Sequence, residues 1–206
     1  MDRWSLHNND LNIPRRPKHQ GILNLGTPTH FKYLKKMANN STLDPSQLPS
    51  SIIEGTLYLG SFAHARNLKI FHQLNIGLVI NCAREIPNYH SDPTIKYFKM
   101  DLNDDTHFNL MPFFDQVFDV LNQHNNQQQA VLFHCASGCS RSASMVIAYL
   151  MKLNGWTLKQ SYDYVKEHRS KIKPNPGFIE CLIGYEKQLY PTMEVPSIDM
   201  VNYHQL

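Results

Sequence analysis

The sequence predicts an α/β fold in which a central, mostly parallel, twisted sheet is flanked by helices. Short apolar runs, of the kind that form strands buried on both faces, alternate with longer segments of helical periodicity. After the last of these strands the chain continues as a run of helices. Because such an alternation is typical of parallel sheets covered on both faces, we expect that architecture here.

The first half of the predicted domain contains three strands and one helix. The first strand ends before Gly60, and the second is a continuous apolar run of the buried type. The helix between them carries Leu68, Phe71 and Leu74 at helical spacing. The strands are expected at residues 56–59, 78–82 and 95–100, and the helix at residues 62–74.

The second half begins with the clearest helix, residues 110–121, whose apolar side chains recur on one face of a helix. Asn109 is expected to cap it, with Pro112 in the first turn where no internal amide bond is lost. Thr157 and Asn175 are expected to cap two later helices. One buried strand is expected at residues 130–133, and helices at residues 141–153, 158–171 and 177–189.

Composition divides the chain into a flexible N-terminal extension at residues 1–50, a folded domain at residues 51–190 and a C-terminal tail at residues 191–206. The net charge of +3 is too weak to indicate a nucleic-acid partner. There is neither an apolar run of about 18 residues nor a secretory signal, so no membrane partner is expected. The four cysteines lack the dense spacing of a secreted disulfide scaffold and so favour a reducing compartment, the cytoplasm with the nucleus as an option.

The segment HCASGCSRS, residues 134–142, lies between the strand at 130–133 and the helix at 141–153. The amides of such a turn and of the following helix N-terminus form an anion site, and Gly138 permits the backbone conformation that it needs. Arg141 offers a planar fork for two phosphoryl oxygens. The same positive surroundings favour a thiolate at Cys135, toward which Ser142 can donate a hydrogen bond. His134 is expected to orient the loop rather than act as a base.

This motif, His134-Cys135-x5-Arg141-Ser142, resembles the signature of the cysteine-dependent protein tyrosine phosphatase superfamily. Further stretches resemble its dual-specificity branch, over about residues 52–190; they are Gly60 with the strand before it, Val79-Ile80-Asn81, Ala148-Tyr149-Leu150-Met151 and Pro174-Asn175-Pro176-Gly177-Phe178. The resemblance implies a protein tyrosine phosphatase-like fold and hydrolysis of phosphotyrosine and phosphoserine or phosphothreonine through a cysteinyl-phosphate, without metal or cofactor. Asn81 is expected to support the site.

The resemblance also implies a general acid in the loop after Met100. In relatives the acid precedes by five residues the Asn of the Asn-Leu that opens the next helix, and here that count leads from Asn109 to Asp104. Asp105 and Asp101 remain alternatives. The expected roles are therefore nucleophile for Cys135, phosphate binding and transition-state stabilisation for Arg141, general acid and base for Asp104, and thiolate stabilisation for Ser142. Substrate binding is assigned to Ala136, Ser137, Gly138, Cys139, Ser140 and Arg141.

Phosphoprotein substrates are expected because the variable loop positions carry no charge, whereas phosphoinositide phosphatases of this superfamily tend to place Lys there. The aromatic segment that deepens the pocket of strict tyrosine phosphatases has no counterpart. One alternative is a catalytically weak module that binds phosphoproteins, although both Cys135 and Arg141 are retained. A rhodanese-like sulfurtransferase, an arsenate reductase and a zinc site fit the motif less well, the last because no CxxC pair accompanies it.

Two further features concern regulation. Cys82 matches a position where some relatives carry a cysteine that forms a reversible disulfide with the nucleophile, and Cys139 is a second candidate partner. The alternative for Cys82 is an ordinary small buried residue. Residues 15–25, basic and then aliphatic, resemble a peptide that docks on a protein kinase.

Overall fold

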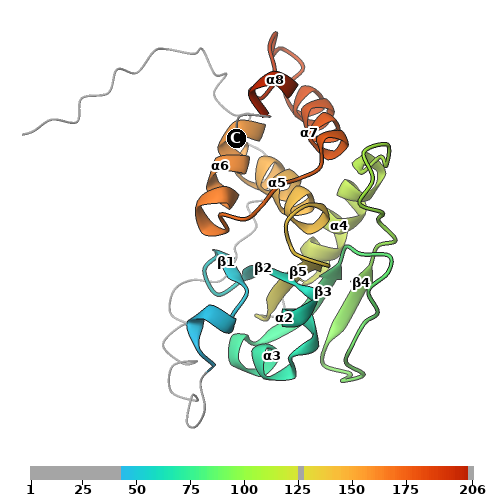
Figure 1. Ribbon diagram of the computed structural model, residues 1–206, viewed down its shortest axis with the longest axis vertical. Helices are drawn as coiled ribbons and strands as arrows, with labels where there is room; N and C mark the ends of the chain where they lie inside the picture. Colours follow the sequence, from blue (N-terminus) through green and yellow to red (C-terminus); the bar gives the residue numbers. More distant parts are fainter. Residues whose placement is uncertain (1–42, 125–127, 204–206) are drawn as a thin grey trace, which may run out of the picture.

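The computed structural model describes residues 43–124 and 128–203, which contain a five-stranded sheet in the order β1-β2-β5-β3-β4 (Figure 1). Strand β5 lies in the middle, and it pairs in parallel with β2 and β3, which in turn pairs in parallel with β4. Only β1 runs antiparallel, on the outer side of β2. The prediction of a mostly parallel sheet is therefore confirmed. The strands are β1 Ser50–Ile53, β2 Leu57–Ser61, β3 Ile76–Asn81, β4 Lys96–Lys99 and β5 Ala130–Cys135.

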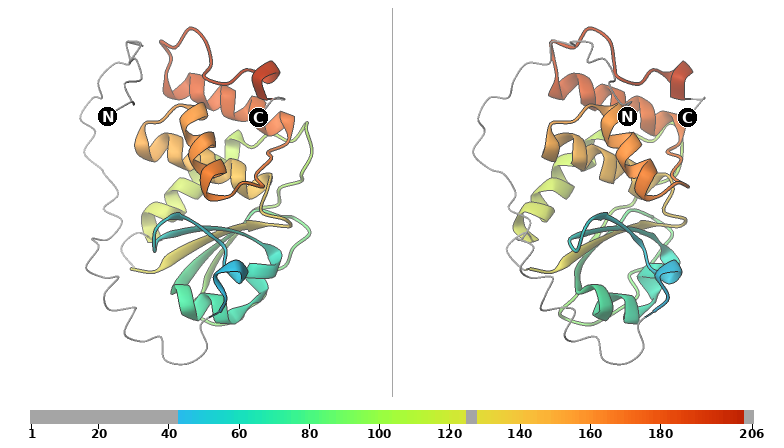
Figure 2. Two further views of the ribbon diagram at one scale, coloured as in Figure 1. Left: turned by 60° about the vertical axis from the view of Figure 1, so that its left-hand side comes forward. Right: turned by 90° about the vertical axis from the view of Figure 1, so that its left-hand side faces the viewer.

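Helices cover both faces of the sheet. Helices α2 and α3 lie on one face, while α4, α5, α6 and α7 form a thicker layer on the other (Figures 1 and 2). The bounds are α2 Phe62–Arg66, α3 Leu68–Leu74, α4 Met111–His124, α5 Arg141–Asn154, α6 Leu158–His168, α7 Pro176–Leu189 and α8 Met200–Tyr203, with a 3-10 turn at Pro45–Gln47. No helix in these described parts is long and apolar enough to span a bilayer.

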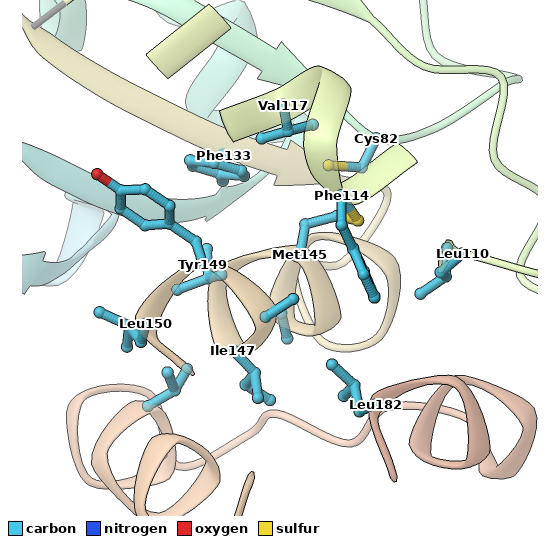
Figure 3. Close-up of a cluster of buried hydrophobic side chains, with 14 of the residues drawn as sticks. Cys82, Leu110, Phe114, Val117, Phe133, Met145, Ile147, Tyr149, Leu150 and Leu182 are labelled. Atoms are coloured by element: carbon cyan, nitrogen blue, oxygen red, sulfur yellow. The ribbon is translucent and has the colours of Figure 1, made fainter. Parts of the chain in front are cut away.

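The alternation of side chains along β5 divides the core into two clusters. Val131 and Phe133 face the thick helical layer, whereas Leu132 faces the smaller cluster on the α3 side. Helix α5 runs through the middle of the larger cluster, where Met145 lies beside Phe114 of α4 (Figure 3). Because both ends of the segment 134–142 continue into buried elements, its backbone is held from two sides.

Two helices differ from the expectation. The segment 62–74 forms two helices because Asn67 has an extended backbone (φ −94°, ψ 98°) and its side chain accepts a hydrogen bond from the Lys69 amide that restarts the helix. The helix expected at 158–171 ends at His168, since Arg169 turns away from it toward the loop of residues 134–142, here called the motif loop. The caps expected at Asn109, Thr157 and Asn175 accept the hydrogen bonds that define them.

The structure adds detail at both ends of the expected domain. Strand β1 begins at Ser50, and part of the expected C-terminal tail folds back, since Ile198 and Tyr203 are buried in the larger core cluster. Tyr203 contacts the ring of Tyr162 edge to face, which fixes this segment against α6. Residues 1–42, including the expected kinase-docking segment 15–25, lie outside the described residues.

Candidate active site

The motif loop lies at the carboxyl end of the central strand β5 and leads directly into α5. Open parallel sheets bind ligands beyond the carboxyl ends of their strands. Gly138 has φ +71°, and a Cβ at this position would lie 2.1 Å from the Gly60 carbonyl oxygen. Only glycine therefore combines this backbone conformation with so close a contact to β2.

Cys135 is the last residue of β5, and its side chain lies under the loop. Its Sγ accepts hydrogen bonds from the Ser142 Oγ and from the Gly138 amide, both at 3.2 Å. One donor is a hydroxyl on the first turn of α5 and the other is an amide of the loop itself. Two donors directed at one sulfur stabilise its negatively charged form.

The carbonyl groups of the motif loop accept hydrogen bonds from residues that lie outside the loop. The Ala136 carbonyl accepts from the Phe62 amide at 3.2 Å, and the Cys139 carbonyl accepts from the Lys173 amide at 2.8 Å. The carbonyls of residues 137 and 138 both accept from Arg169. Because the C=O and N–H of one peptide unit point in opposite directions, the amides of residues 137–140 point away from these partners. Such a run of convergent amides is an anion-binding concavity.

Arg141 is buried, and its guanidinium binds Glu85 end-on. Its Nη1 and Nη2 donate to the two Glu85 carboxylate oxygens at 2.7 and 2.6 Å, and Nη1 also donates to the Leu102 carbonyl at 3.1 Å. The buried Nε has no hydrogen-bond partner among the described residues. Since a guanidinium has five N–H groups, the side-on pair formed by Nε and the second Nη2 hydrogen is still available. That pair fits two oxygens of a phosphoryl group.

Glu85 is carried by a loop that Asn81 organises. The Asn81 amide nitrogen donates to the Ile86 carbonyl and to the Asn88 side chain, and its carbonyl oxygen accepts from the Ala83 amide at 3.2 Å. The pKa of Glu85 is lowered from its ordinary value, and the largest cause is the hydrogen bond that its carboxylate accepts from Arg141. Sequence reasoning missed Glu85. The one available signal was its position a few residues after a strand that neighbours β5.

Asp104 is the one of the three candidate acids that reaches the motif loop. Its Oδ1 accepts from the Ser140 Oγ at 2.7 Å and from the Asn175 Nδ2 at 2.8 Å, and its Oδ2 lies 3.6 Å from the Arg141 Nε. Asp105 instead accepts from the His107 amide, and 59% of its side chain is exposed. Asp101 is exposed. Asn175, noticed in the sequence as a helix cap, thus also holds the acid loop.

His134 is fully buried at the end of β5. Burial lowers its pKa to about 4, so the imidazole is neutral at pH 7 and supplies no charge to the site. In the part of the chain that the structure describes, no three His, Cys, Asp or Glu side chains gather closely enough to hold a metal ion.

The sequence of the chain is similar to those of known proteins. The family model for the catalytic domain of dual specificity phosphatases matches residues 57–188, more than half of the chain. Mouse dual specificity protein phosphatase 14 is 39% identical over 146 residues, which cover 71% of this chain and 73% of that protein.

Two solved structures have the same fold. A mouse putative dual specificity phosphatase complexed with zinc tungstate matches with a TM-score of 0.67 and 25% identity, over 75% of this chain and 95% of that one. A human tyrosine phosphatase-like serine/threonine/tyrosine-interacting protein matches with a TM-score of 0.64 and 28% identity, over 69% of this chain and 97% of that one. The chain therefore belongs to the dual-specificity phosphatase family, and it is a cysteine-dependent protein phosphatase.

Proposed function

We propose that Cys135, Arg141, Asp104 and Ser142 are the catalytic residues, and that they remove phosphate from tyrosine, serine and threonine side chains of proteins. The observation that carries this assignment is the side-on pair of the Arg141 guanidinium, at the loop that also covers the Cys135 sulfur. Its Nε makes no hydrogen bond among the described residues and lies 3.6 Å from the Asp104 carboxylate, which the Ser140 hydroxyl of the loop binds. A phosphoryl group bound to that pair and to the loop amides has one face toward the sulfur. Residues 136–141 then form the substrate-binding loop.

The first step transfers the phosphoryl group to the enzyme. The Cys135 thiolate attacks phosphorus, the bond from phosphorus to the substrate oxygen breaks, and Asp104 gives its proton to that oxygen. Arg141 and the loop amides bind the equatorial oxygens, where negative charge is held in the transition state. The hydrogen bond from Ser142 stabilises the thiolate before attack and again when sulfur leaves.

The second step restores the thiolate. Asp104, now ionised, accepts a proton from a water molecule whose oxygen attacks phosphorus, and the S–P bond breaks to release inorganic phosphate. Asp104 is held at the rim of the loop by Ser140 and Asn175, so the same carboxyl group can serve both steps. Asp104 gives up one proton in the first step and regains one from water in the second step. No metal ion or organic cofactor enters this balance.

Phosphoproteins are the substrate class that the loop fits best. The variable loop positions, Ala136, Ser137, Cys139 and Ser140, offer no cation for additional phosphates of an inositol lipid. The mouse relative solved with zinc tungstate binds a tetrahedral oxyanion, which supports an anion site of phosphate size in this fold.

A panel of substrates tests the proposal. We expect the wild-type chain to release phosphate from both phosphotyrosine and phosphothreonine peptides, and to release at least about tenfold less from phosphoinositides presented at equal concentration. Release from the lipids alone would reject the substrate class. Binding of the phosphopeptides without release, even from a generic aryl phosphate, would support the alternative of a phosphoprotein-binding module.

We also propose that Cys82 forms a reversible disulfide with Cys135. Asn81 of β3 pairs with His134 of β5, so Cys82 and Cys135 follow as the next neighbours, and both belong to the larger core cluster. Figure 3 shows Cys82 in that cluster. Neighbouring parallel strands lie about 4.8 Å apart, within the Cα separation that a disulfide needs. Peroxide would oxidise the Cys135 thiolate to a sulfenic acid, and the Cys82 thiol would displace water from it. Burial raises the pKa of Cys82, so its sulfur is protonated until it attacks, and that proton then leaves with the hydroxyl of the sulfenic acid as water.

Mass spectrometry distinguishes Cys82 from Cys139 as the partner. Trypsin releases Cys82 in the peptide 70–84, whereas Cys135 and Cys139 share the peptide 100–141. We expect mild peroxide treatment to link the two peptides, and Cys82→Ser to remove the link while Cys139→Ser keeps it. A bond confined to the peptide 100–141 would assign the partner to Cys139, and the absence of any disulfide in inactivated protein would dismiss this regulation.

Because the four cysteines are free, we propose the cytoplasm or the nucleus as the compartment.

Residues 15–25 are proposed to dock on a protein kinase. The support is the sequence pattern alone, basic residues followed by spaced aliphatic ones, since this segment lies outside the described residues. Docking of that kind would bring a phosphorylated kinase to the active site as a substrate.

A further inference from the structure

Arg169, the first residue after α6, binds the active-site loop from its outer side. Its side chain is buried, with the residue 6% exposed. The Nε donates to the Gly138 carbonyl at 2.7 Å, the Nη2 to the Ser137 carbonyl at 3.0 Å, and the Nη1 to the Ser50 hydroxyl at 3.2 Å. Two of these three bonds therefore fix successive peptide units of the loop.

Those two peptide units carry the amides of Gly138 and Cys139. The Gly138 amide, on the side of its peptide unit opposite to Arg169, donates to the Cys135 sulfur at 3.2 Å. A single peptide thus connects the guanidinium to the nucleophile. A cation on the carbonyl polarises the peptide and strengthens the N–H as a donor. The Cys139 amide is turned the same way and faces the space where phosphate is expected.

The charge of Arg169 has no carboxylate partner within ion-pair distance in the described part of the chain. Burial lowers the pKa of Arg169, and the thiols of Cys139 and Cys135 act in the opposite direction. Burial is the main cause that lowers the pKa of His64 on α2 to about 4, and the positive charges of Arg169 and Lys171 lower it further. Because a buried cation without a counter-ion is costly, a thiolate or a bound phosphate is the natural complement of this one.

We propose that Arg169 is a positioning residue of the phosphatase reaction, which holds the amides of residues 138 and 139 toward the Cys135 sulfur and the phosphoryl oxygens. This inference rests on the proposed roles of Cys135 and the loop. Lysine cannot replace the arginine fully, because an ammonium group has no fixed fork for two carbonyls at different angles.

Arg169→Gln and Arg169→Lys test the proposal against Lys187→Gln, which removes an exposed positive charge on α7. For Arg169→Gln we expect kcat/KM on an aryl phosphate to fall by about 10- to 100-fold, less than or similar to the loss of one oxyanion donor. The inhibition constant of inorganic phosphate is expected to rise about tenfold, since the amides that bind it are less well oriented. The control Lys187→Gln should match the wild type in kcat/KM and in the inhibition constant of phosphate.

The pH dependence of alkylation gives a readout that a loss of stability alone does not move. We expect the pH for half-maximal alkylation of Cys135 by iodoacetamide to rise by about one unit in Arg169→Gln, and by less in Arg169→Lys, which keeps the charge. Arg169→Lys is expected to retain the defect in phosphate affinity. Folded Arg169→Gln with a wild-type alkylation profile and phosphate affinity would overturn the proposal. If Arg169→Gln does not fold, the same two measurements on Arg169→Lys decide it.

The outcome is separable from the proposed function. A wild-type protein without phosphatase activity, or activity that survives Cys135→Ser, rejects the catalytic assignment itself. An active wild type whose Arg169 variants behave like Lys187→Gln rejects the role of Arg169 only.

Discussion

Cys135→Ser is expected to lower kcat on phosphopeptides and on aryl phosphates by about 10⁴-fold or more, since removal of a nucleophile abolishes the covalent route. The positive surroundings that favour a thiolate cannot ionise a serine hydroxyl near neutral pH. The bonds from Ser142 and from the Gly138 amide would be made to an un-ionised oxygen, which attacks phosphorus poorly. Rapid quenching and mass spectrometry should show a phosphoenzyme in the wild type and none in the variant.

The same variant should keep the anion site. Arg141 is held by Glu85 and the Leu102 carbonyl, and the loop carbonyls are bound from outside, so none of these contacts depends on the sulfur. Calorimetric titration with tungstate should give an affinity within about tenfold of the wild-type value. Cys181→Ser on α7 is the matched control and should retain full turnover. Turnover of Cys135→Ser within tenfold of this control would reject a cysteinyl-phosphate mechanism.

Local patterns in the sequence were sufficient for most of the fold. The helix at 110–121 was predicted because its apolar residues follow one repeat that the core then buries. The strand at Ser50–Ile53 was missed because Ser-Ser-Ile-Ile has no clear alternation, and its extended conformation comes from pairing with β2. The break at Asn67 was missed for a related reason, since the apolar residues that indicated a helix, Leu68 onward, all lie after the break.

The residues of the active site also fall into a group that the local sequence predicts and a group that it does not. The sulfur, the hydroxyl of Ser142, the glycine and the arginine lie within nine consecutive residues, so their proximity needs no tertiary information. Glu85 lies 56 residues from Arg141, and Arg169 lies 31 residues from Gly138. Their contacts arise from strand register and from the path of the chain after α6, neither of which leaves a periodic pattern. The contact from Asn175 to Asp104, over 71 residues, is of the same kind.

Asp104→Asn is expected to lower kcat/KM on a phosphothreonine peptide by about 10²- to 10³-fold, the range of general acid catalysis. An alkoxide is a poor leaving group and needs the proton of the acid as the bond to phosphorus breaks. With p-nitrophenyl phosphate, whose phenolate leaves without protonation, the loss in kcat/KM should be at least about tenfold smaller. The ratio kcat/KM is the correct measure, because it extends only to departure of the leaving group and excludes hydrolysis of the intermediate.

Asp105→Asn is the matched control for this change, one residue away with the same loss of charge. Its side chain is largely exposed and holds His107, so both substrates should retain wild-type kcat/KM. The asparagine at position 104 can still accept from Ser140 and Asn175 through its carbonyl oxygen, so the loop should keep its position. If Asp105→Asn instead shows the leaving-group dependence, the acid is Asp105, and the hydrogen bonds of Asp104 serve only to hold the loop.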